Sequence, residues 1–143
     1  MIKMRFNGEE IFLYLSGQAM FELDEIRVAW NDGHVQQENV FGVHDLLSQM
    51  DAERAGVLFR SVEILERAAL AARRALGQDE FTVATAEELQ ALAKPKDMLE
   101  LQKAVLKTIV DGYATDAEHN EPVDLFMLEN KKKRTSAKAR RSS

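Results

Sequence analysis

The side chains with most scope for chemistry are three histidines and an acidic cluster near the C-terminal end of the chain. No two of the histidines His34, His44 and His119 have the spacing of a shared metal site. The cluster consists of Asp116, Glu118, His119, Glu121 and Asp124. Its oxygen ligands suit a hard cation, but it lacks the glycine and the ligand register of an EF-hand loop. We interpret it as a solvated acidic segment, with cation binding as the alternative.

Patterns typical of catalysis are missing elsewhere in the sequence. No glycine-rich loop could hold a phosphate, and no serine or threonine stands in a recognisable nucleophile motif. The chain has no cysteine, which excludes disulfides, thiolate catalysis and cysteine-based zinc sites. Glu22, Asp24 and Glu25 lie close together, and we interpret them as the wet face of a helix rather than an acid/base pair. The sequence therefore predicts a protein that is not an enzyme, with no catalytic residues, metal or cofactor.

The charge of the last thirteen residues is opposite to that of the rest of the chain. Residues 131–143 hold seven of the 19 Lys and Arg and none of the 24 Asp and Glu. Residues 1–130 therefore carry 12 basic against 24 acidic side chains, a net charge of −12, although the whole chain sums to −5. The last thirteen residues include no apolar side chain larger than alanine, so we expect a disordered tail.

Length and composition indicate one globular domain. A chain of 143 residues that is 45% hydrophobic and 30% charged is long enough to bury a core. The N-terminus lacks the apolar stretch of a signal peptide, and no run of 18 apolar residues predicts a membrane span. We expect a cytoplasmic protein with no membrane contact. Its acidic body would repel phosphate, which argues against nucleic-acid binding by the folded surface.

The first fifteen residues have the pattern of a β-hairpin. Ile2, Met4 and Phe6 alternate with basic residues, and an apolar run follows from Ile11. Asn7-Gly8 separates the two runs, and both residues tolerate the positive φ angles of a type I′ turn. Because an isolated hairpin is marginal in water, we expect it to pack on the helices that follow.

The remainder of the body has helical periodicity. Ser16 is the expected N-cap of a helix with Ala19, Leu23, Ile26 and Trp30 on one face, which Asn31-Asp32-Gly33 would end. Residues 34–41 are predicted to be a loop, and 42–49 a short helix with Val43, Leu46, Leu47 and Met50 inward. Asp51 would cap a helix over 52–76, ended by Gly77, with Leu58, Val62, Leu65, Ala69, Ala72 and Leu76 in the core.

Two more helices are expected before residue 114. Thr85 and Glu88 form a capping box for a helix to Ala93, and Phe81 and Val83 in the preceding loop would dock on the core. Pro95 ends that helix and can begin the next, over 96–113. Met98, Leu101, Val105, Ile109 and Tyr113 share one face of it. The sequence predicts an α+β fold, mostly α, in which an N-terminal hairpin packs on four to five helices. We divide the chain into a domain over 1–113, an acidic linker over 114–130 and a basic tail over 131–143.

Two segments are candidates for partner binding. The first is an apolar island in the acidic linker, made of Val123, Leu125, Phe126, Met127 and Leu128 with Asp124 among them. It either docks back on the helical body or folds into a groove of a partner. The second is the basic tail, which is either a solvated charge run or a contact for nucleic acid or an acidic protein. The tail has no aromatic residue, so base stacking could not contribute.

The N-terminal sequence resembles that of a known family. MIKMRFNGEEIFLYL leading into SGQAMFELDEI is similar to the opening of tail assembly chaperones of long-tailed bacteriophages. These proteins commonly begin with a lysine-rich strand, Asn-Gly, a second strand and an amphipathic helix. The helical body, with an Ala/Leu-rich middle helix and a later helix after a proline, is also similar. The resemblance covers roughly residues 1–113 and is one of pattern.

The resemblance implies a role in phage or prophage tail assembly without chemistry. Such chaperones coat the long, helical, apolar tape measure protein before the tube closes, and they help to recruit tail tube protein. The expected partners are therefore these two proteins, with self-association an open alternative. The apolar island over 123–128 is the first candidate for client contact, and exposed positions of the long helix are the second.

The resemblance also gives the tail another interpretation. In this family, ribosomal frameshifting near the end of the gene often makes a longer product that shares the N-terminal domain. Lys131, Lys132 and Lys133 could be encoded by consecutive adenines, which would form a slippery site. The tail would then reflect coding constraints and need no binding role.

Two rival functions are open at this point. A small helical phage connector would oligomerise permanently, whereas a chaperone would be monomeric or weakly self-associating. A nucleic-acid-binding accessory protein would work through the basic tail, and its affinity would weaken steeply with salt.

The frameshift hypothesis makes a prediction about the gene. We expect an adenine-rich slippery heptamer at the codons of Lys131, Lys132 and Lys133, with an overlapping reading frame, because slippage needs a homopolymeric run. Reading the coding DNA checks this. Lysine codons that interrupt the run of adenines would contradict the hypothesis.

Overall fold

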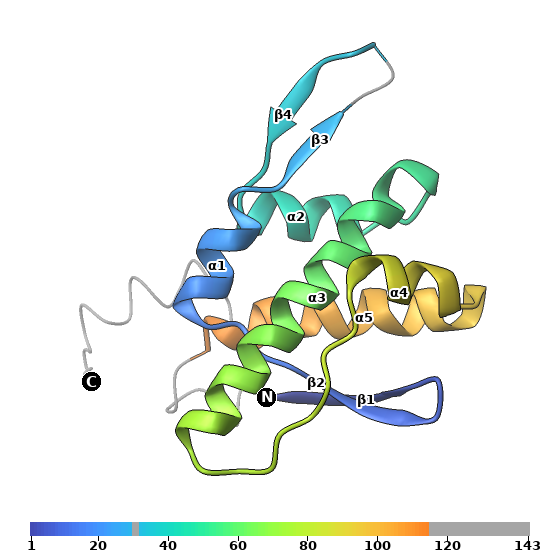
Figure 1. Ribbon diagram of the computed structural model, residues 1–143. Coiled ribbons are helices and arrows are strands. Elements are labelled where there is room, and N and C mark those ends of the chain that lie inside the picture. Colours follow the sequence, from blue (N-terminus) through green and yellow to red (C-terminus); the bar gives the residue numbers. More distant parts are fainter. Residues whose placement is uncertain (30–31, 115–143) are drawn as a thin grey trace, which may run out of the picture. The chain divides into compact units, whose positions relative to one another are not determined.

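The computed structural model describes residues 1–29 and 32–114 of the chain. Its elements in chain order are β1 (Ile2–Phe6), β2 (Glu9–Leu13), α1 (Gly17–Leu23), β3 (Arg27–Ala29), β4 (Val35–Gln37), α2 (Val40–Leu47), α3 (Ala52–Ala75), α4 (Ala86–Leu92) and α5 (Pro95–Gly112). Five helices and two short hairpins within these residues make an α+β fold that is mostly α (Figure 1). The predicted fold class is confirmed.

The chain divides into two units, residues 1–109 and residues 110–143. The first holds both hairpins, α1 to α4 and most of α5. The expected apolar island and the basic tail both lie outside the described residues.

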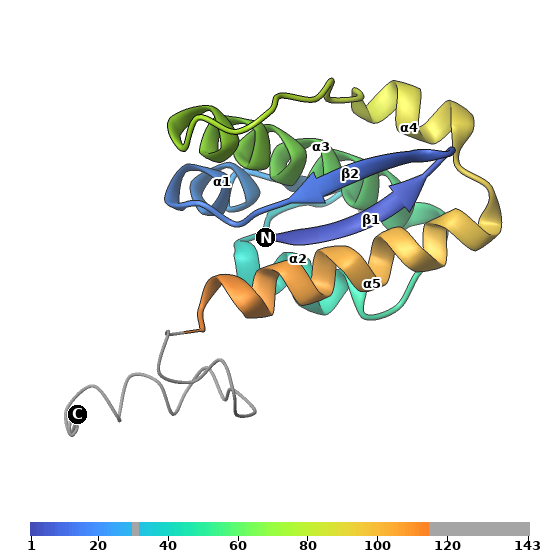
Figure 2. The same ribbon diagram turned by 90° about the horizontal axis from the view of Figure 1, so that it is seen from below.

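The N-terminal hairpin forms as the sequence predicts. β1 and β2 pair antiparallel, with Ile2 opposite Leu13 and Phe6 opposite Glu9. Asn7 and Gly8 both have positive φ angles, 53° and 81°, as a two-residue type I′ turn requires. Figure 2 shows α3 on the β2 side of this hairpin and α5 on the β1 side. One face of β2 is buried through Ile11 and Leu13, so the hairpin contributes to the core.

α3 is the central helix of the fold. It contacts β2, α1, α2 and α4, and the backbone N–H of Tyr14 donates to the carbonyl of Leu65 at 3.2 Å. A helix surrounded in this way must be apolar on more than one face. Its buried residues accordingly cover most of its circumference: Val57, Leu58, Phe59, Ser61, Val62, Ile64, Leu65, Glu66 and Ala69.

The first helix is shorter than predicted. α1 begins after Ser16, whose hydroxyl accepts from the N–H of Ala19, but it ends at Leu23 rather than near residue 30. Strands β3 and β4 follow and pair antiparallel. The predicted helix stop at 31–33 belongs to the connection of this second hairpin, where Gly33 has a φ of +85°. Trp30, predicted on the face of α1, lies outside the described residues.

The predicted loop over 34–41 is also wrong. It contains β4 and the start of α2, which begins two residues earlier than expected. Asn39 caps α2 through the N–H of Gly42, and the carboxylate of Asp24 accepts from the N–H of Val40 at 2.6 Å. Asp24 thus ties the end of α1 to the start of α2. The predicted buried positions Val43, Leu46 and Leu47 are confirmed.

The later helices agree with prediction to within two residues. Asp51 caps α3 and Gly77, with a φ of +71°, follows its end. The capping box of Thr85 and Glu88 is present at α4. α5 begins at Pro95 and buries Leu101, Ala104, Val105, Thr108 and Ile109.

Four positions predicted in the core stripes are not fully buried: Ala72, Met98 and Tyr113 are half-buried, and Leu76 is exposed. Leu76 is 70% exposed and is the C-cap of α3 rather than a residue of the helix. Tyr113 is half-buried and lies just beyond the end of α5 rather than on it. The docking of Phe81 is confirmed, since its ring centroid lies 5.3 Å from that of Phe12 on β2.

The contrast between Leu65 in α3 and Leu76 at its C-cap predicts different costs of truncation. Leu65 is fully buried, so Leu65→Ala should lower the free energy of unfolding by about 2–5 kcal/mol through lost contacts and a cavity. Leu76→Ala, the matched control, should change it by less than about 0.5 kcal/mol. Urea denaturation followed by circular dichroism measures both. Equal losses would contradict the described end of α3.

Candidate functional site

The best candidate site is a pocket of about 460 Å³ between the turn of the first hairpin and α4. Figure 2 shows the turn between β1 and β2 next to α4, and residues of both line the pocket. The lining residues are Phe6, Asn7, Glu9, Ile11, Glu66, Thr82, Val83, Ala84, Glu88, Leu89, Ala91 and Leu92. We call this space the hairpin–α4 pocket.

Local sequence signals place the walls of the hairpin–α4 pocket. The tight Asn7-Gly8 turn sets Phe6 and Ile11 on one wall, and the guanidinium of Arg5 donates to the carbonyl of Gly8 at 2.8 Å. On the other wall, the carboxylate of Glu88 accepts from the N–H of Thr85 and so fixes the start of α4. Residues 82–84 close the space between these two elements.

Glu66 is the least expected residue of this lining. It lies near the middle of α3 and is fully buried, and neither carboxylate oxygen has a hydrogen-bond partner among the described residues. Burial raises the pKa of Glu66 from 4.5 to about 8, and the negative charge of Glu63 adds to the rise. At neutral pH the group is therefore mostly a neutral carboxylic acid.

Sequence analysis did not single out Glu66, although a signal was present. Glu66 lies four residues after Val62 and three before Ala69, both of which belong to the predicted core stripe. An acid at core spacing is an unusual position, since ionised side chains are rarely buried without a partner.

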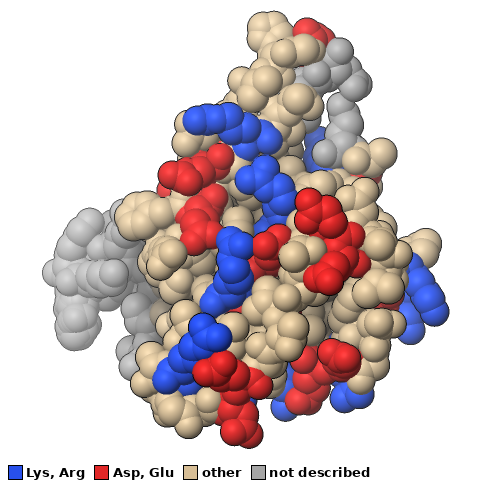
Figure 3. Space-filling view, in the orientation of Figure 1, with Lys and Arg blue, Asp and Glu red and all other residues tan. Residues whose placement is uncertain are grey.

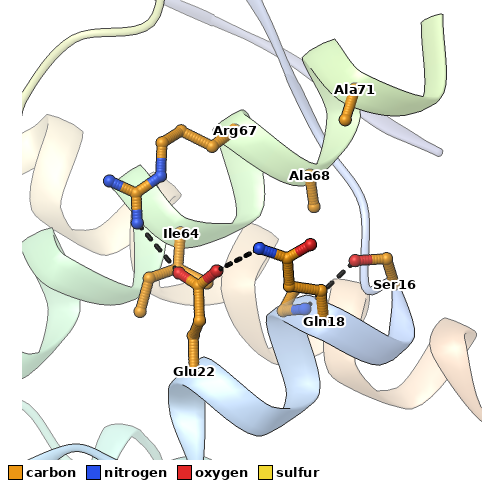
Figure 4. Close-up of a pocket in the computed structure, with 8 residues that line it drawn as sticks. Ser16, Gln18, Glu22, Ile64, Arg67, Ala68 and Ala71 are labelled. Atoms are coloured by element: carbon orange, nitrogen blue, oxygen red, sulfur yellow. Dashed lines mark hydrogen bonds and ion pairs between the residues drawn. The ribbon is translucent and has the colours of Figure 1, made fainter.

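A second, smaller pocket of about 170 Å³ lies between α1 and α3, where Ala68 and Ala71 leave room (Figure 4). Glu22 accepts from the side chain of Gln18 at 3.1 Å and from Arg67 at 2.9 Å. Arg67 also pairs with Glu63 at 2.8 Å. These polar groups already have partners. Their contacts join α1 to α3 and leave no free polar group among them to bind a ligand.

The charged surface around α3 is mixed in sign. Figure 3 shows basic and acidic side chains interleaved on the face that carries this helix. Arg67 pairs with Glu22 and Glu63, and Arg74 pairs with Glu80 at 3.1 Å. Such exposed pairs each contribute at most about 1 kcal/mol. The basic side chains form a column on this face in Figure 3, and the acidic side chains on both sides of it offset part of its attraction for a phosphate backbone.

The other sequence-predicted chemical groups are dispersed or lie outside the described residues. His34 has Asp32 as its nearest charged neighbour, at 3.9 Å, and His44 has Asp45, at 3.7 Å. No group of three or more potential ligands could hold a metal within 1–29 and 32–114. Glu22 and Asp24 make structural contacts, while Glu25 is exposed.

The remaining sequence-predicted residues belong to the C-terminal part of the chain. His119 and the acidic cluster lie outside the described residues, as do the apolar island and the three lysines at 131–133.

Comparison with known proteins adds nothing to this geometry: no family model, curated protein or solved structure matches the chain. Across the part of the chain that the structure describes, no helix combines the length and apolar character needed to cross a membrane.

The raised pKa of Glu66 predicts that stability depends on pH. Between about pH 4.5 and 8, the folded protein keeps the proton that the unfolded chain releases. The free energy of unfolding should therefore fall as pH rises through this window, by up to about 1.4 kcal/mol per pH unit from this group. Glu66→Gln should remove this part of the slope.

Urea denaturation from pH 5 to pH 9 measures the effect. Glu87→Gln, an exposed change on α4, is the matched control and should leave the wild-type slope intact. If Glu66→Gln and wild type have parallel pH profiles, the carboxyl is not perturbed as described.

Proposed function

We propose that this protein is a non-enzymatic tail assembly chaperone of a long-tailed phage or prophage. In this proposal it binds tape measure protein through apolar surface and helps to recruit tail tube protein in the cytoplasm of the bacterial host. The single observation that carries the proposal is the N-terminal order of a hairpin with an Asn7-Gly8 turn, then a helix capped by Ser16.

Exposed apolar side chains near α4 also support the proposal. Leu92 at the end of α4 is 51% exposed, and Leu99 in the first turns of α5 is 56% exposed. Leu92 also lines the hairpin–α4 pocket. A chaperone for an amphipathic helical client needs apolar surface that is open in the free protein. The net charge of −12 over residues 1–130 would keep the complex with such a client soluble.

Co-expression tests the function. The full chain should raise the soluble fraction of a candidate tape measure protein, because its apolar surface would cover that of the client. Replacing Val123, Leu125, Phe126, Met127 and Leu128 together with serine should reduce this rescue. Deleting residues 131–143 is the matched control and should preserve it, since the tail has no assigned role in client binding.

Three outcomes would overturn the proposal. The first is no rescue of any tape measure protein encoded beside this gene. The second is a stable ring on size exclusion, which a connector would form. The third is salt-sensitive duplex DNA binding that is lost on deletion of the tail.

A further inference from the structure

The charge of the hairpin–α4 pocket has one sign. Three carboxylates belong to its lining: Glu9 on β2, Glu66 on α3 and Glu88 on α4. No lysine, arginine or histidine is among the lining residues. Glu88 already accepts the N–H of Thr85, whereas Glu66 has no partner among the described residues. The pocket therefore lacks a cation.

The rest of the lining is largely apolar. Phe6, Ile11, Val83, Leu89 and Leu92 provide most of the large side chains, and Leu92 is half exposed at the rim. A volume of about 460 Å³ is within the usual range for ligand pockets, and it can hold several side chains of a partner segment. An occupant must therefore cover apolar surface and present a positive group to a buried acid.

We infer that the hairpin–α4 pocket binds an amphipathic helical segment of a partner, which inserts a lysine or arginine toward Glu66 and packs its apolar neighbours on Phe6, Ile11 and Leu92. The long apolar stem of either basic residue can lie along the apolar wall while its charged end reaches the acid. The carboxylate and the cation then form a charge-assisted pair out of water.

Charge complementarity favours this occupant over two others. A purely apolar segment would leave the carboxyl of Glu66 buried without a partner, which is costly. A second copy of this chain that pairs pocket to pocket would bring the same three acids together, since a two-fold interface is self-complementary. A basic amphipathic segment satisfies both the charge and the apolar wall.

The inference specifies the chemistry of the client and in that respect rests on the proposed function. The pocket itself can be probed without any phage protein. The probe is a synthetic Ala/Leu-rich helical peptide of about 18 residues, long enough to be helical in water, with one lysine within its apolar face. The matched peptide carries methionine at that position.

Calorimetric titration of the full chain with each peptide is the experiment. The lysine peptide should bind about 10- to 100-fold more tightly than the methionine peptide at pH 8, as expected for a charged hydrogen bond. Below pH 8 the affinity for the lysine peptide should fall by up to tenfold per pH unit, because Glu66 must lose its proton to pair. The negative charge of Glu63, on the same helix, opposes that loss, and Glu9 on β2 and Glu88 on α4 are the other acids of the pocket lining.

Variants separate Glu66 from the general acidity of the chain. Glu66→Gln should remove both the lysine preference and the pH dependence, while Glu87→Gln, outside the lining, should keep them. Ala91→Lys would place a cation of the chain itself at the pocket and should weaken binding of the lysine peptide. Ala91→Met adds similar bulk without the charge and is the matched control. If Glu66→Gln fails to fold, comparison of the two Ala91 variants still tests the inference.

Equal binding of both peptides, or binding that Glu66→Gln leaves unchanged, overturns the inference. Peptide-independent dimerisation that Ala91→Lys abolishes would assign the pocket to a second copy instead, and also overturns it. If the lysine peptide binds as expected but the chain fails to solubilise tape measure protein, the inference about the pocket stands and the proposed function is wrong.

Discussion

The fold depends on the burial of α3 from several sides at once. Four elements contact this helix, and their other mutual contacts are few: α1 touches α2, and each hairpin pairs with itself. A five-residue strand or a helix of seven or eight residues cannot bury enough surface to be stable alone. β2, α1, α2 and α4 each gain that surface from α3. The 24-residue length of α3 and its many small alanines make this arrangement feasible.

This dependence makes the position of Glu66 informative. A glutamate in the buried centre of α3 costs stability whenever it ionises, because it has no partner to replace water. A leucine at the same position would continue the core between Val62 and Ala69 without that cost. The helix therefore tolerates a polar group where its packing does not require one. Pockets and perturbed acids that coincide in this way are typical of binding sites.

Sequence patterns predicted the elements whose signals are local and missed those that depend on distant contacts. The Asn7-Gly8 turn, the cap at Ser16 and the box of Thr85 and Glu88 each act within four residues, and all are present. The end of α1 is different. Leu23 and Ile26 continue a helical spacing, but Asp24 accepts from Val40, sixteen residues away, and the chain turns into β3. No signal in the neighbouring sequence predicts that contact.

The second hairpin was missed for a related reason. Its strands have three residues each, too few to show alternation, and β4 is exposed throughout. The Asn31-Asp32-Gly33 signal was recognised as a break but assigned to the end of a helix, since both interpretations use a glycine with positive φ. Leu76 shows the converse limit: its spacing fits the core stripe, yet it is the C-cap of α3 and its side chain is 70% exposed.

The distribution of paired and unpaired acids decides where a ligand should be sought. Glu22 and Glu63 share Arg67, and Glu63 also accepts from the N–H of Ala86, the first residue of α4, at 2.8 Å. Those acids join elements of the fold, and an added ligand would have to displace an existing partner. Glu66, which lines the pocket beside β2 and α4, has no such partner to lose, so a cation that enters has only to displace its proton. The same residue type thus has a structural role at Glu22 and Glu63, while at Glu66 it leaves an interaction for a second molecule to complete.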